Sequence, residues 1–63
     1  MTEWRKTTSA QFRNLEREQR ALAQGASSTA TRDIHLEFAE RYRLKAEELD
    51  AAERQRRRSE RHE

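Results

Sequence analysis

The chain contains no cysteine, no proline and a single glycine among its 63 residues. Without cysteine it has neither a disulfide nor a thiolate metal site. A phosphate-binding loop built on several glycines is excluded, because Gly25 stands alone. No apolar run approaches the ~20 residues that cross a membrane, and the first residues lack the apolar segment of a signal peptide. We therefore expect a cytoplasmic protein with no metal, no cofactor and no membrane partner.

The chain also lacks a recognisable catalytic constellation. Its two histidines, His35 and His62, stand at no recognisable spacing from a serine or threonine nucleophile. The pair of Glu-x-x-His motifs that binds two irons in helical bundles is missing. The sequence therefore predicts that the protein is not an enzyme.

Helix-favouring residues dominate what remains. Valine is absent and alanine abundant, and charged residues make up 41% of the chain although the formal net charge is only +2. Several acids stand four residues before an arginine, the orientation that stabilises a helix best, as in Glu16 with Arg20 and Asp50 with Arg54. The scarcity of large apolar residues leaves one alternative, a chain that is disordered alone and folds on self-association.

The segment Gly25-Ala26-Ser27-Ser28 separates two long alanine-rich stretches with apolar residues at helical spacing. A left-handed Gly25 would close the first helix, and Ser28 would cap the second. We predict an all-α fold, an antiparallel helical hairpin with helices over about residues 3–24 and 29–58. A start after Thr8, with Gln11 completing a capping box, is the alternative; the earlier start is favoured because it gives Trp4 a place on the apolar stripe.

One antiparallel register pairs the apolar stripes of both helices. Facing positions have index sums of about 53 or 54, so Phe12 would face Tyr42, Leu15 would face Phe38 and Trp4 would face Leu49. In this register large residues meet large ones in all but one layer. The predicted core of the hairpin or oligomer consists of eight large side chains: Trp4, Phe12, Leu15, Leu22, Ile34, Phe38, Tyr42 and Leu49.

So few large apolar residues stabilise a lone chain poorly, and without disulfides the remaining route is association. Leu36 and Leu44 lie opposite the predicted stripe of the second helix and form a candidate second association face. A two-fold dimer making a four-helix bundle is the simplest closed form. The predicted function is a non-enzymatic protein–protein interaction or structural module that acts as a homodimer and has a face left for another protein.

His35 borders the predicted core stripe, and Gln19 lies within the stripe of the first helix. The favoured interpretation is a half-buried histidine hydrogen-bonded to Gln19; the alternative is a pH-sensitive switch at the helix interface. For Gln19 two roles stand open: a polar residue that fixes the register of an assembly, or a side chain whose polar end reaches water.

The basic character of the chain is concentrated at its end. Residues 1–53 carry a formal charge of −1 and form the predicted hairpin, whereas residues 54–63 carry +3 and form an arginine-rich extension that frays at its end. An arginine-rich helix can follow a row of phosphates, so nucleic-acid binding is the alternative function. It is not favoured, because no aromatic residue lies nearby to stack on bases. The candidate contacts are Arg54, Arg56, Arg57, Arg58 and Arg61.

Residues 20–46 resemble a family of small helical proteins of alphaproteobacteria. The matching residues are Arg20-Ala21-Leu22-Ala23, Gly25-Ala26-Ser27-Ser28, Thr31-Arg32, Leu36, Ala39-Glu40 and Tyr42. Members of that family often have Asp-Pro where this chain has Ser28-Thr29. The family has no settled activity, so the resemblance implies a small bacterial helical protein and nothing further.

Overall fold

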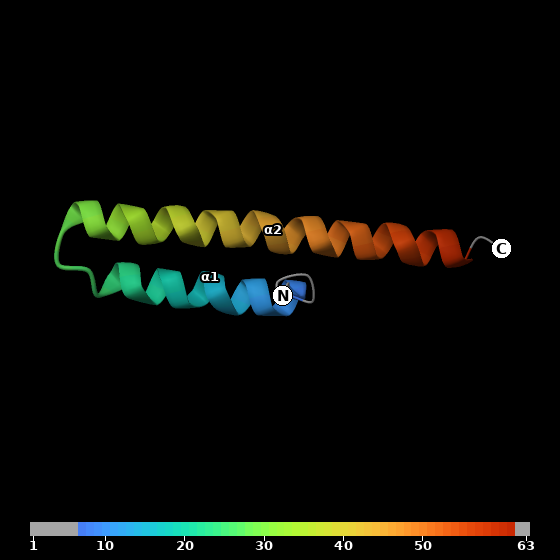
Figure 1. Cartoon of the computed structure of the whole chain (residues 1–63), viewed down its shortest axis with the longest axis horizontal. Coiled ribbons are helices and arrows are strands. Elements are labelled where there is room, and N and C mark those ends of the chain that lie inside the picture. Colours follow the sequence, from blue (N-terminus) through green and yellow to red (C-terminus); the bar gives the residue numbers. More distant parts are fainter. Residues whose placement is uncertain (1–6, 62–63) are drawn as a thin grey trace, which may run out of the picture.

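The fold is an antiparallel hairpin of two α-helices (Figure 1). The computed structural model of the chain describes residues 7–61, with side chains for residues 7–58. Helix α1 runs Ser9–Gln24 and helix α2 runs Thr29–Arg61, with no strand in the described part. The two helices lie side by side along the whole of α1 and are joined by a short turn. The predicted all-α hairpin is therefore confirmed.

Helix α1 begins later than the sequence predicted. Thr8 has an extended backbone (φ −92°, ψ 168°) and its side-chain oxygen accepts from the Gln11 N–H at 3.2 Å. The Gln11 side chain accepts in turn from the Thr8 N–H at 2.8 Å, which completes a capping box. The favoured start near residue 3 is wrong, because this reciprocal cap fixes the boundary at Ser9. The predicted contact between Trp4 and Leu49 lies outside the described residues.

The turn between the helices uses the predicted serine cap but not a left-handed glycine. Ser28 Oγ accepts from the Thr31 N–H at 3.1 Å, as expected of a cap at the start of α2. Gly25 has φ −91° and ψ 3°, a conformation open to any residue, so the predicted left-handed closure is wrong. Its N–H still donates to the Ala21 carbonyl at 3.2 Å and ends α1 with an ordinary helical bond.

The predicted register is confirmed at two layers. The ring centroids of Phe12 and Tyr42 lie 6.1 Å apart with a 31° tilt, a favourable aromatic pair. Closer to the turn, His35 Nδ1 lies 2.7 Å from Gln19 Oε1, so the favoured interpretation of His35 as a hydrogen-bonded, half-buried histidine is confirmed. Both pairs have an index sum of 54.

Alanines, not large side chains, form the closest contact between the helices. Of the described residues, those classed as buried are Ala23, Ala39 and Ala46. Alanine has no side chain beyond Cβ, so the two backbones can approach closely at these positions. Burying one methyl group contributes only about 0.8 kcal/mol, against about 1.5–3 kcal/mol for a fully buried leucine or phenylalanine. The hairpin therefore has a thin core.

Three residues of the predicted hairpin core are exposed in the single chain. Leu22, Ile34 and Phe38 are 52%, 53% and 42% exposed, whereas Phe12, Leu15, Tyr42 and Leu49 are half-buried. The prediction placed Ile34 and Phe38 in the stripe of α2 and put His35 and Ala39 on its flank. The structure exchanges these roles because α2 is rotated so that Ala39 and Ala46 face α1. A role for the three exposed residues in an oligomer core stays a prediction.

Helix α2 continues well past α1 (Figure 1). At 1.5 Å per residue, its 33 residues span about 50 Å and the 16 residues of α1 about 24 Å. Asp50 is the last half-buried residue, and residues 51–58 are all exposed. We call residues 51–61 the arm. The helix extends through Arg61, three residues beyond the predicted end, so most of the predicted extension 54–63 is helical.

Neither helix, over its described residues, has a stretch long and apolar enough to cross a membrane.

Candidate functional site

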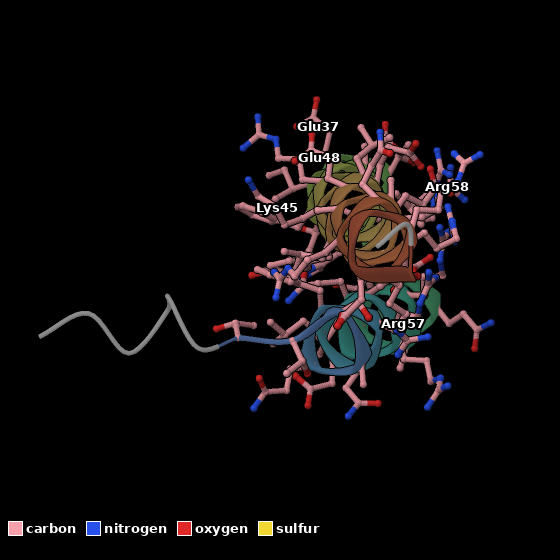
Figure 2. All side chains as sticks on the ribbon, turned by 90° about the vertical axis from the view of Figure 1, so that its right-hand side faces the viewer. Glu37, Lys45, Glu48, Arg57 and Arg58 are labelled. Atoms are coloured by element: carbon pink, nitrogen blue, oxygen red, sulfur yellow. The ribbon has the colours of Figure 1, made fainter. Side chains whose placement is uncertain are left out.

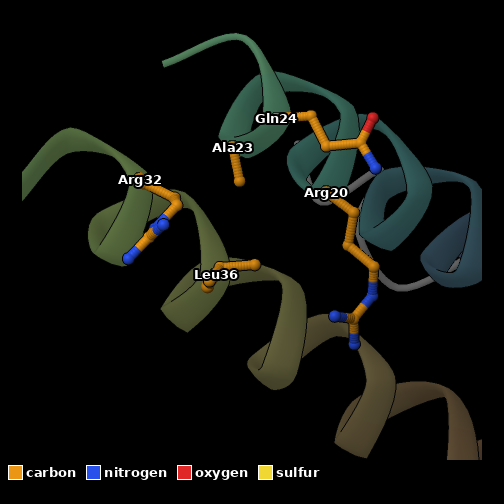
Figure 3. A pocket seen from close by; sticks show the side chains of 5 residues that line it. All are labelled: Arg20, Ala23, Gln24, Arg32 and Leu36. Atoms are coloured by element: carbon orange, nitrogen blue, oxygen red, sulfur yellow. The ribbon is translucent and has the colours of Figure 1, made fainter. Parts of the chain in front are cut away.

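The hairpin has two different long sides, one polar and one apolar. On the polar side, Arg13 of α1 reaches Asp50 of α2 at 2.5 Å. Nearer the turn on the same side is a shallow hollow, shown in Figure 3 and lined by Arg20, Ala23, Gln24, Arg32 and Leu36. Charged and polar groups from both helices thus cover this edge of the alanine seam.

The other side carries the exposed apolar residues. Consecutive residues of a helix are turned by about 100°, so the neighbours of a seam residue point to opposite sides. Gln24 follows Ala23 and lies on the polar side, so Leu22, which precedes Ala23, lies on the other side. In the same way, Phe38 and Glu40 flank Ala39 and lie on opposite sides of α2. We call this side the apolar face. It comprises Leu15 and Leu22 of α1 and Ile34, Phe38, Tyr42 and Leu49 of α2.

The apolar face is shared by both helices and continuous with the seam. Tyr42 and Leu49 are half-buried, Tyr42 against the Phe12 ring of α1, and Tyr42 follows the exposed Phe38 by four residues on the same face. The guanidinium of Arg41 lies over the Phe38 ring, with Cζ 5.8 Å from the centroid. This cation–π contact covers part of one ring and leaves the rest of the face open.

The proposed second association face is not assembled as predicted. Leu36 is 38% exposed and lines the hollow with Ala23, so it borders α1 instead of pointing away from it. Leu44 is 46% exposed and lies further round α2. The rotation of α2 that buries Ala39 also brings Leu36 toward the seam, whereas Leu44, about 80° further round the helix, points away from it. The two leucines therefore do not form one face opposite the hairpin contact.

Arginine–carboxylate pairs fix the side chains of the polar side. Arg43 binds Glu40 and also Glu47, the latter at 2.7 Å. The hydrogen bond that Arg43 donates lowers the pKa of Glu40, and the same bond raises the pKa of Arg43. Hydrogen bonding from Arg13, then from Ser9, lowers the pKa of Asp50. These groups are exposed or only half-buried, so their ion pairs orient side chains more than they stabilise the fold.

The arm displays arginines around a single unpaired helix. Figure 2 looks along the helices from the C-terminal end: Arg58 projects to one side, Lys45 to the opposite side, and Arg57 toward the line of α1. Glu37 and Glu48 project away from α1 in the same view. Residues 54–58 contain four arginines and no acid. Of the predicted contacts, Arg54, Arg56, Arg57 and Arg58 are exposed, and the side chain of Arg61 lies outside the described part.

The described residues contain no group of three or more histidine, aspartate or glutamate side chains that could hold a metal ion. His35 is engaged with Gln19 inside the hairpin, and His62 lies outside the described range. The apolar face and the arm are therefore the two surfaces on which a function can be argued.

Comparison of the chain with protein-family models, with curated proteins and with solved structures gave no match. The resemblance of residues 20–46 to small alphaproteobacterial proteins stays a prediction.

Proposed function

We propose that the protein is a non-enzymatic interaction module that works as a homo-oligomer, associating through its apolar face. The observation that carries this proposal is the distribution of burial: the helices bury alanines between them and leave Leu22, Ile34 and Phe38 about half exposed. Covering exposed apolar side chains is the main driving force of association. A two-fold dimer would give a four-helix bundle with these residues in its centre.

The thin seam supports the same proposal. Three alanines and a few half-buried side chains contribute little to the stability of so small a chain. In a four-helix bundle the apolar face becomes core, so folding and association are coupled. The module then offers its polar side to another protein while the apolar face holds the two copies together.

Light scattering of the protein at micromolar concentration tests the proposal. We expect twice the chain mass of 7.6 kDa, unchanged in high salt because the contact is apolar. Phe38→Ala should weaken the dimer by at least about 100-fold, since truncating a buried phenylalanine costs about 3–5 kcal/mol, or roughly 100- to 4,000-fold in Kd. A monomeric parent protein with full helicity would end the proposal.

Leu44→Ala is the matched control. Leu44 and Phe38 are similarly exposed in the single hairpin, at 46% and 42%, and both are large and apolar. Leu44 lies outside the apolar face, so its truncation should leave the dimer mass unchanged. If Leu44→Ala dissociated the dimer while Phe38→Ala left its mass unchanged, the contact would lie elsewhere on α2.

A second candidate function, binding of nucleic acid by the arm, has one observation in its favour. The arm remains helical beyond α1 and presents four exposed arginines with no acid between Arg54 and Arg58. Guanidinium groups bind phosphate well, and neutralising about four phosphates gives strong salt dependence. The arm carries no aromatic residue for stacking, so sequence-specific binding is not proposed.

Titration of a labelled oligonucleotide at about 50 and 200 mM salt tests this second function. Affinity should fall about 100-fold between the two conditions if four phosphates are contacted. Replacing Arg54, Arg57 and Arg58 by glutamine should abolish binding, whereas the same change at Arg17, Arg32 and Arg41 of the hairpin should reduce it far less. Equal losses of affinity in both triple variants, or no binding of the oligonucleotide by the parent chain, would show that the arm is not a nucleic-acid-binding site.

A further inference from the structure

We infer that the two copies pack their apolar faces antiparallel about a two-fold axis near Tyr42, which points their arginine arms in opposite directions. The inference rests on the self-association proposed above and adds the orientation of the second copy. In the alternative, parallel dimer, every residue lies at the same height as its own counterpart, and α2 of each copy packs against α1 of the other. Three features of the described residues favour the antiparallel arrangement.

The first feature is Lys45. It projects toward the side of the apolar face (Figure 2) and is the charged residue that follows Phe38 by seven positions on that side of α2. In a parallel dimer α2 would pack against α1 of the second copy, and Lys45 would lie there at the height of Ser9 and not of an aromatic ring, because facing positions have an index sum of 54. With an axis near Tyr42, Lys45 instead lies across from Phe38 of the second copy, where its stem and charge can cover the ring.

The second feature is the symmetry of the face itself. Ile34 lies eight residues before Tyr42 and Leu49 seven residues after it, so an axis at Tyr42 places Ile34 of one copy against Leu49 of the other. A two-fold contact requires such a self-complementary patch, in which residue i meets j and j meets i. Leu15 of α1 extends the same apolar strip on both copies.

The third feature is the charge of the arm. Residues 54–58 carry four positive charges and no negative one, whereas the described hairpin, residues 7–49, has equal numbers of acids and bases. A parallel dimer would place the two arms at the same end of the bundle on diagonally opposite helices, about 11–14 Å apart when neighbouring helices are about 8–10 Å apart. Like charges at this distance repel even in salt solution. Antiparallel packing separates the arms to opposite ends of the bundle.

The absence of cysteine allows a direct test, because one introduced cysteine can carry a single spin label per chain. Arg57 is exposed and projects toward the line of α1, so in a parallel bundle the two copies of this position would lie near the bundle axis (Figure 2). For an axis at Tyr42, labels on Arg57→Cys would lie about 45 Å apart along the bundle, at 1.5 Å per residue on each copy. In a parallel dimer they would lie about 10–20 Å apart.

Double electron–electron resonance on the full chain, with the mass measured on the same sample, separates the outcomes. A dimer with a distance near the longer value supports the antiparallel arrangement. A dimer with a short distance overturns it and leaves the proposed self-association standing. A monomer with no interspin distance overturns both.

Mixing experiments with an arm of opposite charge give an independent measurement on the unlabelled chain. In a parallel dimer, a variant with Arg54→Glu, Arg57→Glu and Arg58→Glu would pair preferentially with the parent, because the two arms would lie at the same end of the bundle. In an antiparallel dimer the arms lie at opposite ends, so native mass spectrometry should find the statistical half of mixed dimers. A mixed-dimer fraction well above one half would contradict the inference.

Discussion

The paired part of α2 and the arm belong to one continuous helix, yet they are held in different ways. Between Thr29 and Asp50, α2 has a partner, with alanines against α1 and an aromatic pair across the seam. From residue 51 onward every described side chain is exposed. Only the helical preference of its own residues supports the arm, and preference alone is marginal in water. Helicity in the two regions should therefore respond to different changes.

Proline substitutions give the largest expected contrast. Proline inside a helix removes a backbone hydrogen bond and clashes with the preceding turn, at a cost of about 3 kcal/mol. Glu37→Pro, at an exposed site in the paired part, should abolish most helical circular dichroism. Gln55→Pro, equally exposed in the arm, should remove only the signal of the last turns and leave the melting of the hairpin unchanged.

An equal loss of helical circular dichroism in both proline variants would contradict this prediction. That result would mean that the arm is bound against another surface in solution. Measuring both variants at high salt distinguishes a charged surface from an apolar one, since only the former is screened.

A glutamate placed in each region gives the next largest contrast. Ala39 is fully buried against α1 and Ala51 is exposed at the start of the arm. Ala39→Glu forces a charged side chain into the seam and should destabilise the hairpin by roughly 2–3 kcal/mol. Ala51→Glu should stay within about 0.5 kcal/mol of the parent. Urea unfolding followed by circular dichroism measures both; equal midpoints would show that the seam is not the stabilising contact.

The sequence predicts the position of the turn, the Ser28 cap and the register, because each depends on local chemistry or on counting. It does not predict the rotation of α2 about its own axis. Two stripes share Tyr42, Ala46 and Leu49 and diverge toward the turn, one through Ile34 and Phe38 and the other through His35 and Ala39. Hydrophobicity favours the first, whereas close approach of two backbones favours the second.

The regular alternation of three and four residues at positions 32, 35, 39, 42, 46 and 49 is the signal that indicates the observed seam. Large apolar residues outside it are then free for a different partner. From one chain, a pattern cannot distinguish a leucine that packs within the hairpin from one that packs against a second molecule. This ambiguity is the physical reason that the predicted core contains Leu22, Ile34 and Phe38.

The turn should tolerate, and even favour, a substitution that a left-handed glycine would forbid. At Gly25 an added Cβ would meet its nearest atoms, the carbonyl oxygens of Ala21 and Leu22, at 4.0 Å, and φ is negative. Gly25→Ala should therefore stabilise the hairpin by about 0.4–1 kcal/mol by reducing the freedom of the unfolded chain. Thermal unfolding would show a raised midpoint, with hydrogen exchange of the arm unchanged. A lowered midpoint would indicate a left-handed Gly25 in solution.

The smallest expected effect lies at the junction of the two regions, where Arg13 of α1 holds Asp50 at the base of the arm. Hydrogen bonding from Arg13 lowers the pKa of Asp50 below its ordinary value of 3.8, so the ionised carboxylate is favoured in the folded state. The stabilisation is then complete above about pH 4 and is lost as the pH falls through the folded-state pKa. Asp50→Asn should lower the melting temperature slightly at neutral pH and leave it unchanged in strong acid. Glu40→Gln is the matched control, because Glu40 pairs with Arg43 within α2. The difference in melting temperature between parent and Glu40→Gln should likewise vanish in strong acid, but hydrogen exchange at the base of the arm should not change. A difference between parent and Asp50→Asn that persisted in strong acid would mean that Asp50 acts there through packing and not through its charge.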